Sequence, residues 1–391
     1  MDIVKRSTRL FLVVGVALLL TACARPYRVA DFDARPPGQA HFPGLHTLVA
    51  NAPDRVLDVL LVHGMCSHDV GWAVNAIDAL RAGLGAHYPP GAEGPARRSG
   101  DVIVYQRTLI APGGTVRANA LVWTPVIAGL KRQLCYDQSV KSELCGTDPC
   151  DSPAYPHSRA KLNARLKDVI LNDCLADAII YQGASRDAIL KQLRQAMLDA
   201  LARSGGRPLA ADILQTVTGE RAPLVVITES LGSKVAFDAL YQLLRDADLK
   251  ARAAAERTLE RMVQIFMGAN QMPILALADQ TLDGQARSTG YPAEPLAELV
   301  ALRRDGPGAA YHPPLRVVAF TDPNDVLSYA LARGKPRQSY DVVDVLVSNA
   351  DTYLGQLEEP FSAHMNYRTN PEVMRLMVCG NPSPQACVAA Q

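Results

Sequence analysis

Runs of consecutive apolar residues alternate along the chain with segments in which apolar residues recur every three or four positions. A short unbroken run is typical of a strand buried on both faces of a sheet, and the longer period is typical of a helix with one buried side. The predicted strands are the run ending at Val62, residues 102–105, residues 223–227, and the runs MVQIFMG, LRVVAFTD and DVVDVLVSNA. The predicted helices span roughly residues 73–84, 187–203, 232–247 and 371–378.

Strands that alternate with helices in this way favour a mostly parallel sheet covered by helices on both faces, which is the α/β fold class. One segment interrupts the alternation, because residues from about 107 to 206 are helix-rich and cysteine-bearing. A segment of that length is too long for a loop between two neighbouring strands. We therefore expect a helical cap inserted in a sheet domain that spans residues 51–391.

The first 23 residues have the pattern of an export signal. Three basic residues precede an apolar stretch from residue 10 to 20, which is too short to span a bilayer. The following Leu-Thr-Ala-Cys resembles a bacterial lipobox, which implies removal of residues 1–22 and attachment of lipid to Cys23. A plain secretory signal with an incidental cysteine is the alternative.

The residues after Cys23 support two further predictions. Ala24 stands where an aspartate would favour the inner membrane in bacterial lipoproteins, so the resemblance points to the outer membrane, facing the periplasm or the cell surface. Residues 23–50 contain several prolines and little periodicity, so we expect a tether between the membrane and the globular part.

The composition supports a large core and narrows the range of partners. Apolar residues make up 48% of the chain and charged residues 20%, which is typical of a globular protein. The formal net charge is +1 and no run of Lys and Arg with interleaved aromatics is present, so nucleic-acid binding is not expected. No C-x-x-C or nearby histidine pair completes a zinc ligand set, so we expect no metal.

The eight cysteines agree with export to an oxidising compartment. If Cys23 carries lipid, seven remain, and one of them has no partner. Four cluster in the insertion and two lie near the end, so six could form three bridges and leave Cys66 over. Buried thiols are the alternative, and the sequence does not choose among the pairings of Cys135, Cys145, Cys150 and Cys174.

The stretch ITESLGSKV turns a buried strand into a helix at Ser230. A serine at such a corner is the setting of a nucleophile elbow, in which strained backbone angles lift the hydroxyl clear of the sheet. Small residues are needed two positions either side, and Gly232 meets this need while Thr228 stands where glycine is usual. A helix N-cap is the alternative role for this serine. Lys234 could suggest a Ser–Lys dyad, but a lysine in an amphipathic helix is usually solvated.

A serine hydroxyl needs a base, and a histidine base needs an orienting carboxylate. His364 lies after the last predicted strand, in a loop before a well-capped helix, where it can reach the carboxyl edge of the sheet. Two acidic candidates, Asp322 and Asp325, follow the penultimate strand. We favour Asp325, because Asp322-Pro323-Asn324 is typical of a turn that would use Asp322 for its own backbone bonds.

Two backbone N–H groups are needed to hold the oxyanion of a tetrahedral intermediate. The residue after the nucleophile, Leu231, offers one of them. The loop after the first strand, in LLVHGM, offers the other from Met65, because Gly64 lets the chain turn there. His63 is then a structural residue of this loop and not the base.

Together LLVHGM, ITESLGSKV, FTDPNDVLSY and AHMNYRTN resemble the α/β-hydrolase superfamily, in its lipase and serine-esterase branches, over residues of about 55–380. The resemblance implies an α/β-hydrolase fold and a triad of Ser230, Asp325 and His364, in the chain order Ser, Asp, His. It also implies hydrolysis of carboxylic esters, including lipid esters, through an acyl-enzyme and without a cofactor. An amidase or acyltransferase with the same triad, and a non-catalytic membrane-tethered envelope protein, are the alternatives.

Overall fold

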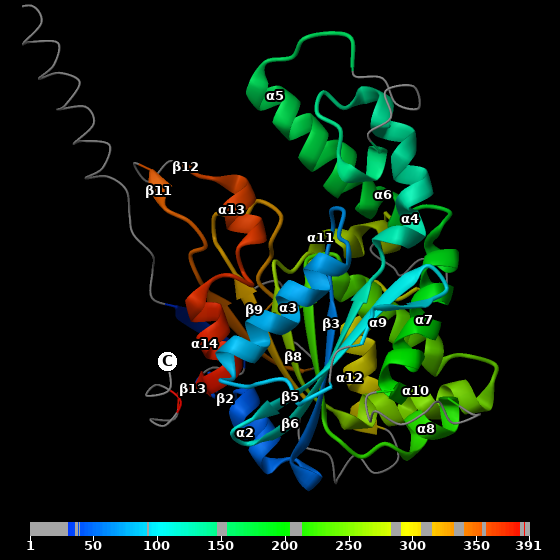
Figure 1. Ribbon diagram of the computed structural model, residues 1–391, viewed down its shortest axis with the longest axis vertical. Helices are drawn as coiled ribbons and strands as arrows, with labels where there is room; N and C mark the ends of the chain where they lie inside the picture. Colours follow the sequence, from blue (N-terminus) through cyan, green and yellow to red (C-terminus); the bar gives the residue numbers. More distant parts are fainter. Residues whose placement is uncertain are drawn as a thin grey trace, which may run out of the picture.

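The computed structural model describes residues 30–35, 38, 40–91, 94–146, 155–203, 213–282, 291–305, 315–331, 340–353, 357–383 and 387. These residues form an α/β structure around one nine-stranded sheet (Figure 1). The lipobox, Cys23 and Cys150 lie outside the described residues. No described helix is long and apolar enough to cross a bilayer.

The sheet is mostly parallel, as the apolar runs predict. Across it lie β1 (Asp31–Arg35), β10 (Asp341–Leu346), β9 (Arg316–Thr321), β8 (Met262–Gly268), β7 (Leu224–Glu229), β3 (Val56–Val62), β6 (Gly114–Val122), β5 (Val102–Ala111) and β4 (Arg97–Ser99). The strands from β10 to β6 in this order run parallel to one another. β1 at one side, and β5 and β4 at the other, are antiparallel to their neighbours.

Both faces of the sheet are covered, because side chains of successive residues on a strand point to opposite faces. On β3, Leu57, Val59 and Leu61 belong to one core, and Leu60 and Val62 belong to the other. The first core includes α2 (Leu45–Asn51), α3 (Val70–Gly83) and α14 (Pro371–Cys379), and the second includes α7 (Arg186–Arg203), α9 (Gly232–Leu244), α10 (Leu249–Arg261) and α12 (Pro295–Asp305) (Figure 1). The helices α3, α7, α9 and α14 confirm the four that the periodicity predicts.

The structure differs from the expectation of a tether over residues 23–50. From residue 30 onwards much of this segment is folded: β1 pairs with β10, and β2 (Phe42–Pro43) pairs with β13 (Gly380–Asn381). Leu45 and Val49 of α2 are fully buried. A few apolar residues between prolines are enough to dock this segment on the sheet, although they are too few to produce a visible period.

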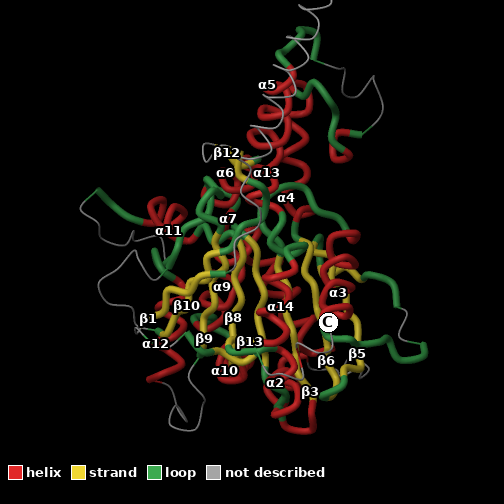
Figure 2. The backbone as a smooth tube through the Cα atoms, turned by 90° about the vertical axis from the view of Figure 1, so that its left-hand side faces the viewer, coloured by secondary structure: helices red, strands yellow, loops and turns green. Residues whose placement is uncertain are grey.

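The cap is also shorter than residues 107–206. β6 forms a hairpin with β5 across Pro112 and Gly113 and then lies parallel to β3, so residues up to 122 belong to the sheet. At the other end α7 covers the sheet face as part of its core. The inserted cap is residues 124–182, with α4 (Thr124–Lys131), η2 (Arg132–Asp137), η3 (Glu143–Cys145), α5 (Lys161–Arg165), η4 (Leu166–Leu175) and α6 (Ala176–Gln182). It stands above one end of the sheet, with α5 farthest away (Figure 2).

Three disulfides join the cysteines of the described residues, and one of them corrects the sequence-based expectation. Cys66, expected to be left over, is bonded to Cys174. Cys135 is bonded to Cys145, and Cys379 to Cys387. Cys66 and Cys174 are 108 residues apart in sequence, so only the fold brings them together.

Candidate active site

Ser230 occupies the corner between β7 and α9. Its φ of 52° lies in the left-handed region, which a residue other than glycine adopts only where its surroundings hold it there. Its N–H donates to the carbonyl of Gly268 on β8 at 2.8 Å, and its carbonyl accepts from the N–H of Ser233 on α9. The side chain therefore lies at the N-terminus of α9, where the helix N–H groups favour negative charge.

Two glycines let the loop after β3 contact this corner. A Cβ on Gly232 would lie 2.3 Å from the carbonyl oxygen of His63, and a Cβ on Gly64 would lie 2.5 Å from Cβ of Ser230. Any side chain at either position would push the backbone apart. Gly64 is thus needed for close approach rather than for a turn, and the left-handed φ of this loop, 75°, falls on Cys66.

Thr228 stands where the elbow pattern has glycine, and a hydrogen bond accommodates it. Its Oγ1 lies 2.8 Å from Oγ of Ser233, and both residues are fully buried. The hydroxyl of Thr228 therefore joins β7 to the first turn of α9, and the threonine side chain fits at a position where the elbow pattern has glycine.

His364 and Asp325 are in direct contact although they belong to different elements. Asp325 follows β9, and His364 lies on α13 (Pro360–Met365), a short helix where the sequence suggested a loop. Nδ1 of His364 lies 2.9 and 3.0 Å from the two carboxylate oxygens of Asp325. This contact assigns the ring proton to Nδ1 and leaves Nε2 for a second partner.

Asp325 is itself fixed from several directions. Its carboxylate accepts from the N–H of Leu327 at 3.0 Å and from the hydroxyl of Tyr367 at 3.0 Å. The Tyr367 hydroxyl in turn accepts from the N–H of Asp322 at 2.7 Å. Burial and the neighbouring Asp325 raise the pKa of Tyr367 well above its usual value, so this hydroxyl stays protonated as a donor. The sequence pattern alone gave no indication of this role for Tyr367.

Asp322 has a different role from Asp325. One of its carboxylate oxygens accepts from the N–H of Asn324 at 2.9 Å, and the other accepts from the N–H of Asn349 at 2.6 Å. The first bond closes the turn that the sequence predicts. Asp322 also faces Glu358, where burial and the Asp322 carboxylate raise the pKa of Glu358 to about 7. Asp322 therefore ties the loop after β9 to the loop after β10.

A chain of contacts joins Ser230 to the His364–Asp325 pair. Ser230 is bonded to Gly268, and a Cβ on Gly268 would lie 3.2 Å from Cβ of Tyr367, which donates to Asp325. Ser230 is 4% exposed, and its Oγ is buried without a hydrogen-bond partner among the described residues. Among the described residues there is thus no hydrogen bond between Ser230 and His364.

The two amides expected to hold an oxyanion flank Ser230. Met65 follows Gly64, which contacts the serine, and Leu231 is the next residue after it. Both residues are buried, with 4% and 0% of their surface exposed. Neither backbone N–H donates a hydrogen bond to another described residue. Buried N–H groups without acceptors are rare in folded proteins, so this pair is suited to an incoming oxygen.

The position of His63 agrees with its expected structural role. The residue is fully buried, with its ring stacked on Trp123 at a centroid distance of 5.3 Å. Its Nε2 accepts from the N–H of Trp123 at 2.9 Å, and its Nδ1 donates to the carbonyl of Gly64 at 2.8 Å. Burial and the nearby His68 lower the pKa of His63 well below its usual value. A neutral ring with both nitrogens in use cannot accept a proton from Ser230.

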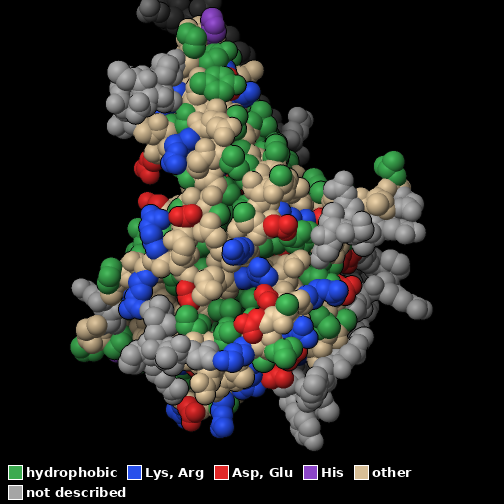
Figure 3. Space-filling model, turned by 90° about the vertical axis from the view of Figure 1, so that its right-hand side faces the viewer, with side chains coloured by type: hydrophobic (Ala, Val, Ile, Leu, Met, Phe, Trp, Pro, Cys, Tyr) green, Lys and Arg blue, Asp and Glu red, His purple; other side chains and the backbone are tan. Residues whose placement is uncertain are grey.

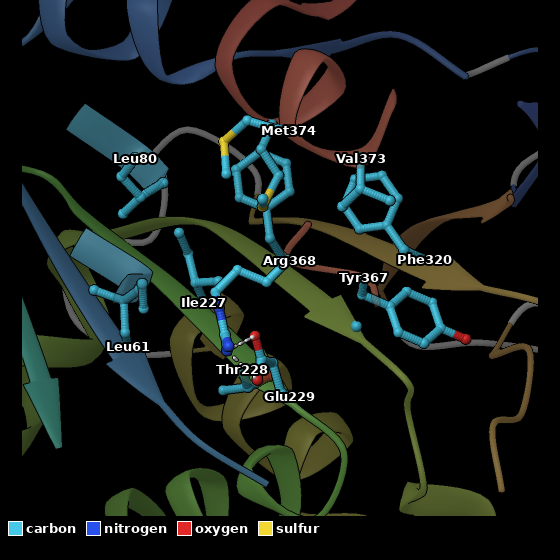
Figure 4. A pocket seen from close by; sticks show the side chains of 14 residues that line it. Leu61, Leu80, Ile227, Thr228, Glu229, Phe320, Tyr367, Arg368, Val373 and Met374 are labelled. Carbon is cyan, nitrogen blue, oxygen red and sulfur yellow. Dashed lines mark hydrogen bonds and ion pairs between the residues drawn. The ribbon is translucent and has the colours of Figure 1, made fainter. Parts of the chain in front are cut away.

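Glu229, next to Ser230, forms a half-buried ion pair with Arg368, which the sequence did not indicate. Its carboxylate accepts from the guanidinium of Arg368 at 3.1 Å and from Nε1 of Trp72 at 3.3 Å. Figure 4 shows Arg368 reaching Glu229 at the rim of an apolar cavity between the sheet and the helices α3 and α14. The cavity measures about 30 Å³, room for a water or two, and is too small for an ester substrate.

Lys234 is not solvated, contrary to the sequence-based expectation. It is fully buried, and its ammonium lies 2.9 Å from both Asp238 and Asp279. Arg186 pairs with the same two carboxylates, and the hydroxyl of Tyr181 donates to Asp238. The Lys234 ammonium is bonded to these carboxylates, and the Ser230 hydroxyl has no hydrogen-bond partner among the described residues, so the two do not form a Ser–Lys dyad in this structure.

One group of described residues has ligand atoms close enough together to hold a metal ion, namely Cys66, Asp173 and Cys174. Both sulfur atoms are used in the disulfide, so they cannot act as thiolate ligands.

Comparisons with protein-family models, with curated proteins and with solved structures find no match to this chain.

Proposed function

We propose that the protein is a serine hydrolase of the α/β-hydrolase type that cleaves carboxylic esters, including lipid esters. Oγ of Ser230 attacks the ester carbonyl while Nε2 of His364 accepts its proton. Asp325 holds the imidazole and stabilises its charged form. The N–H groups of Met65 and Leu231 bind the oxyanion, and His364 then returns the proton to the leaving alcohol. Water, deprotonated by His364, hydrolyses the acyl-enzyme.

The topology supports this fold assignment. Ser230 follows β7, Asp325 follows β9 and His364 follows β10, in the chain order Ser, Asp, His of that superfamily. These strands are parallel, so their carboxyl ends lie at one edge of the sheet, where α/β proteins bind ligands. β3, which carries the loop with Met65, is the neighbour of β7 in the sheet.

The observation that carries the proposal is the state of the Ser230 hydroxyl. It lies on a residue with a φ of 52°, is buried, and has no hydrogen-bond partner among the described residues. A hydroxyl left without a partner in the interior costs about 1–3 kcal/mol, and a strained backbone adds to that cost. An N-cap serine would instead bond its hydroxyl to the helix, and no such bond is present for Ser230 among the described residues.

The cap supports esters with apolar acyl chains as substrates. Exposed hydrophobic side chains lie along its helices, and Figure 3 shows hydrophobic groups spread over this part of the surface. The exposed hydrophobic residues of the cap include Leu162, Leu166, Val169, Leu175 and Ile179. Ile179 and Leu162 are more than half exposed, with 66% and 65% of their surface accessible. Apolar side chains exposed to water on the cap are favourable contacts for a long hydrocarbon chain.

We propose further that Cys23 carries lipid and holds the protein on a bacterial membrane in the cell envelope. Asp31, at the start of β1, pairs with Leu346 at the carboxyl end of β10, so the chain enters the fold at the edge that carries Ser230. Ala30 is the seventh residue after Cys23, and an extended chain of that length spans at most about 25 Å. A short anchor at this edge would keep the proposed site near lipid esters in the membrane.

The test is labelling of the protein with a fluorophosphonate, which reacts only with an activated serine. The unaltered protein is expected to be labelled on Ser230, and Ser230→Ala to lose both labelling and ester hydrolysis while it remains folded. Ser233→Ala is the matched control, since this serine lies on the same helix and its hydroxyl is bonded to Thr228. Full labelling of Ser230→Ala would exclude Ser230 as the nucleophile.

A further inference from the structure

The loop of residues 64–68, here the oxyanion loop, is tied to the cap by a covalent bond and by a carboxylate. Cys66, the residue after Met65, is disulfide-bonded to Cys174 of η4. The adjacent cap residue, Asp173, accepts from the N–H of Ser67 at 3.0 Å and from its hydroxyl at 2.5 Å. Two neighbouring residues of the loop are therefore held by two neighbouring residues of the cap.

A buried lysine reinforces this contact from a second cap helix. The ammonium of Lys131, on α4, lies 2.6 Å from Asp173 and 2.8 Å from Asp177. It also donates to the hydroxyl of Ser67 at 2.9 Å. The Lys131 side chain is 1% exposed, so the ion pairs are little screened by solvent. Lys131 therefore holds the Asp173 carboxylate in the position from which it binds Ser67.

The start of the cap binds the same loop from the other side. Oγ1 of Thr124 accepts from the N–H of His68 at 3.0 Å and donates to the carbonyl of Cys66 at 3.4 Å. Nε2 of His68 lies 3.1 Å from the carbonyl oxygen of Met65. The carbonyl oxygens of Met65 and Cys66, which belong to successive peptide units, therefore each have a partner that the cap supplies or positions.

The loop needs such support because its backbone is strained. Cys66 has a φ of 75°, a conformation that residues other than glycine keep only when tertiary contacts impose it. Without the ties, we expect the loop to relax toward an ordinary φ at Cys66 and to displace Met65, which carries the proposed oxyanion donor. The ties act on the residue beside the proposed oxyanion donor.

We propose that the base of the cap is a positioning device for the oxyanion hole, in which the Cys66–Cys174 bond and Asp173 hold the N–H of Met65 toward Ser230. This inference rests on the proposed hydrolase function and extends it. The cap then has two parts with separate roles, since its base fixes the catalytic loop while the Cys135–Cys145 bond staples only the cap to itself.

The test compares two double variants. Cys66→Ala/Cys174→Ala removes the tie to the loop, and Cys135→Ala/Cys145→Ala removes a cap disulfide that does not reach it. With a short-chain soluble ester, the first variant is expected to lose about 10²-fold in kcat, the loss typical of removing one oxyanion donor, with KM changed less than about twofold. Its fluorophosphonate labelling should slow in parallel. The second variant should keep both rates within about twofold.

Asp173 provides a second route that leaves the disulfide intact. Asp173→Ala removes the acceptor of the Ser67 N–H and the Ser67 hydroxyl, and it is expected to lower kcat by about tenfold or more with KM unchanged. Asp173→Asn keeps one acceptor oxygen and should restore part of the lost kcat. Circular dichroism and Tm identify variants that fail to fold. If the Cys66→Ala/Cys174→Ala variant does not fold, the comparison of Asp173→Ala with Asp173→Asn tests the proposal in its place. If the unaltered protein labels but the folded cysteine and Asp173 variants keep their rates, the positioning role is wrong and the hydrolase stands. If the unaltered protein does not label, both proposals fail.

Discussion

Nδ1 of His364 lies 2.9 Å from Oδ1 and 3.0 Å from Oδ2 of Asp325, although 39 residues separate the two in the chain. The carboxylate is buried and also accepts from Leu327 and Tyr367. An imidazole held in this way keeps one tautomer and one orientation, which is what the general base of a serine hydrolase requires.

This relationship predicts that Asp325→Asn is far more damaging to catalysis than Asp322→Asn. The amide at position 325 would stabilise the wrong imidazole tautomer, and we expect kcat to fall by about 10⁴-fold, as in the best-studied triad. Asp322 bonds to backbone N–H groups of Asn324 and Asn349, so its replacement should mainly lower Tm. Ester hydrolysis by the two purified variants checks this, and a larger kcat loss for Asp322→Asn would reverse the assignment of the acid.

Tyr367→Phe should lower kcat by about tenfold without loss of fluorophosphonate labelling. The change removes one donor from the Asp325 carboxylate, and a hydrogen bond to a charged group contributes roughly 1.5–3 kcal/mol. It also leaves the N–H of Asp322 without its acceptor, so Tm should fall as well. Tyr353→Phe, at a tyrosine that is 51% exposed, is the control and should leave kcat and Tm unchanged. Equal kcat for Tyr367→Phe and the unaltered protein would limit this residue to packing.

The cap carries a titratable group that links stability to pH. Burial raises the pKa of Asp177 to about 7 in the folded protein, partly offset by the Lys131 ammonium, against an ordinary value of 3.8. Because the folded pKa is the higher one, the contribution of Asp177 to stability is fully present below about pH 4 and is lost as pH rises through about 7.

Asp177→Asn should therefore flatten the pH dependence of stability. Between pH 4 and 7 the free energy of unfolding of the unaltered protein should fall relative to that of Asp177→Asn, because over this range the Asp177 carboxyl ionises in the unfolded chain but stays protonated in the folded protein. Urea unfolding at several pH values measures the difference. Asp101→Asn, at an exposed aspartate, is the control. A difference between the Asp177→Asn and unaltered curves that does not vary with pH would mean that Asp177 does not titrate in this range.

Cys23→Ser is expected to separate membrane attachment from chemistry. Without the acyl chains the protein should leave the membrane fraction or accumulate as precursor, since several chains on one cysteine bind a bilayer far more stably than one. Hydrolysis of a soluble short-chain ester should be retained, whereas hydrolysis of esters embedded in vesicles should fall. An unchanged mass and unchanged membrane fractionation would show that Cys23 carries no lipid.

The corner at Ser230 and its order relative to Asp325 and His364 could be predicted because each depends on local pattern. An unbroken apolar run indicates a buried strand, and apolar residues with a helical period indicate a helix with one face toward the core. A serine between two such segments lies at a strand-to-helix corner, whatever the rest of the fold is. The carboxyl ends of parallel strands share one edge, so residues far apart in sequence could be expected to meet there. The preference for Asp325 also came from local turn chemistry at Asp322.

Other features were hidden because their signals depend on partners. β6 was missed, although Pro112 and Gly113 mark its turn, because Arg117 and Asn119 break the continuous apolar run by which the other strands were recognised. Arg117 is half-buried and pairs with Asp58 on the neighbouring strand β3 at 2.6 Å and with Glu220 at 3.1 Å. A buried polar residue whose hydrogen-bond partner is far away in the sequence cannot be distinguished from a surface residue by its pattern alone.

Six strands of the sheet (β3, β5, β7, β8, β9 and β10), the main helices and the candidate nucleophile, base and acid could thus be identified in advance, since these follow from the spacing of apolar residues and the chemistry of short motifs. The pairing of Cys66 with Cys174 and the burial of Lys234 between Asp238 and Asp279 became visible only in the folded chain. A disulfide or an ion pair depends on which side chains the folded chain brings within a few ångströms, and sequence separation does not encode that distance. The support of the oxyanion loop by the cap belongs to this second class.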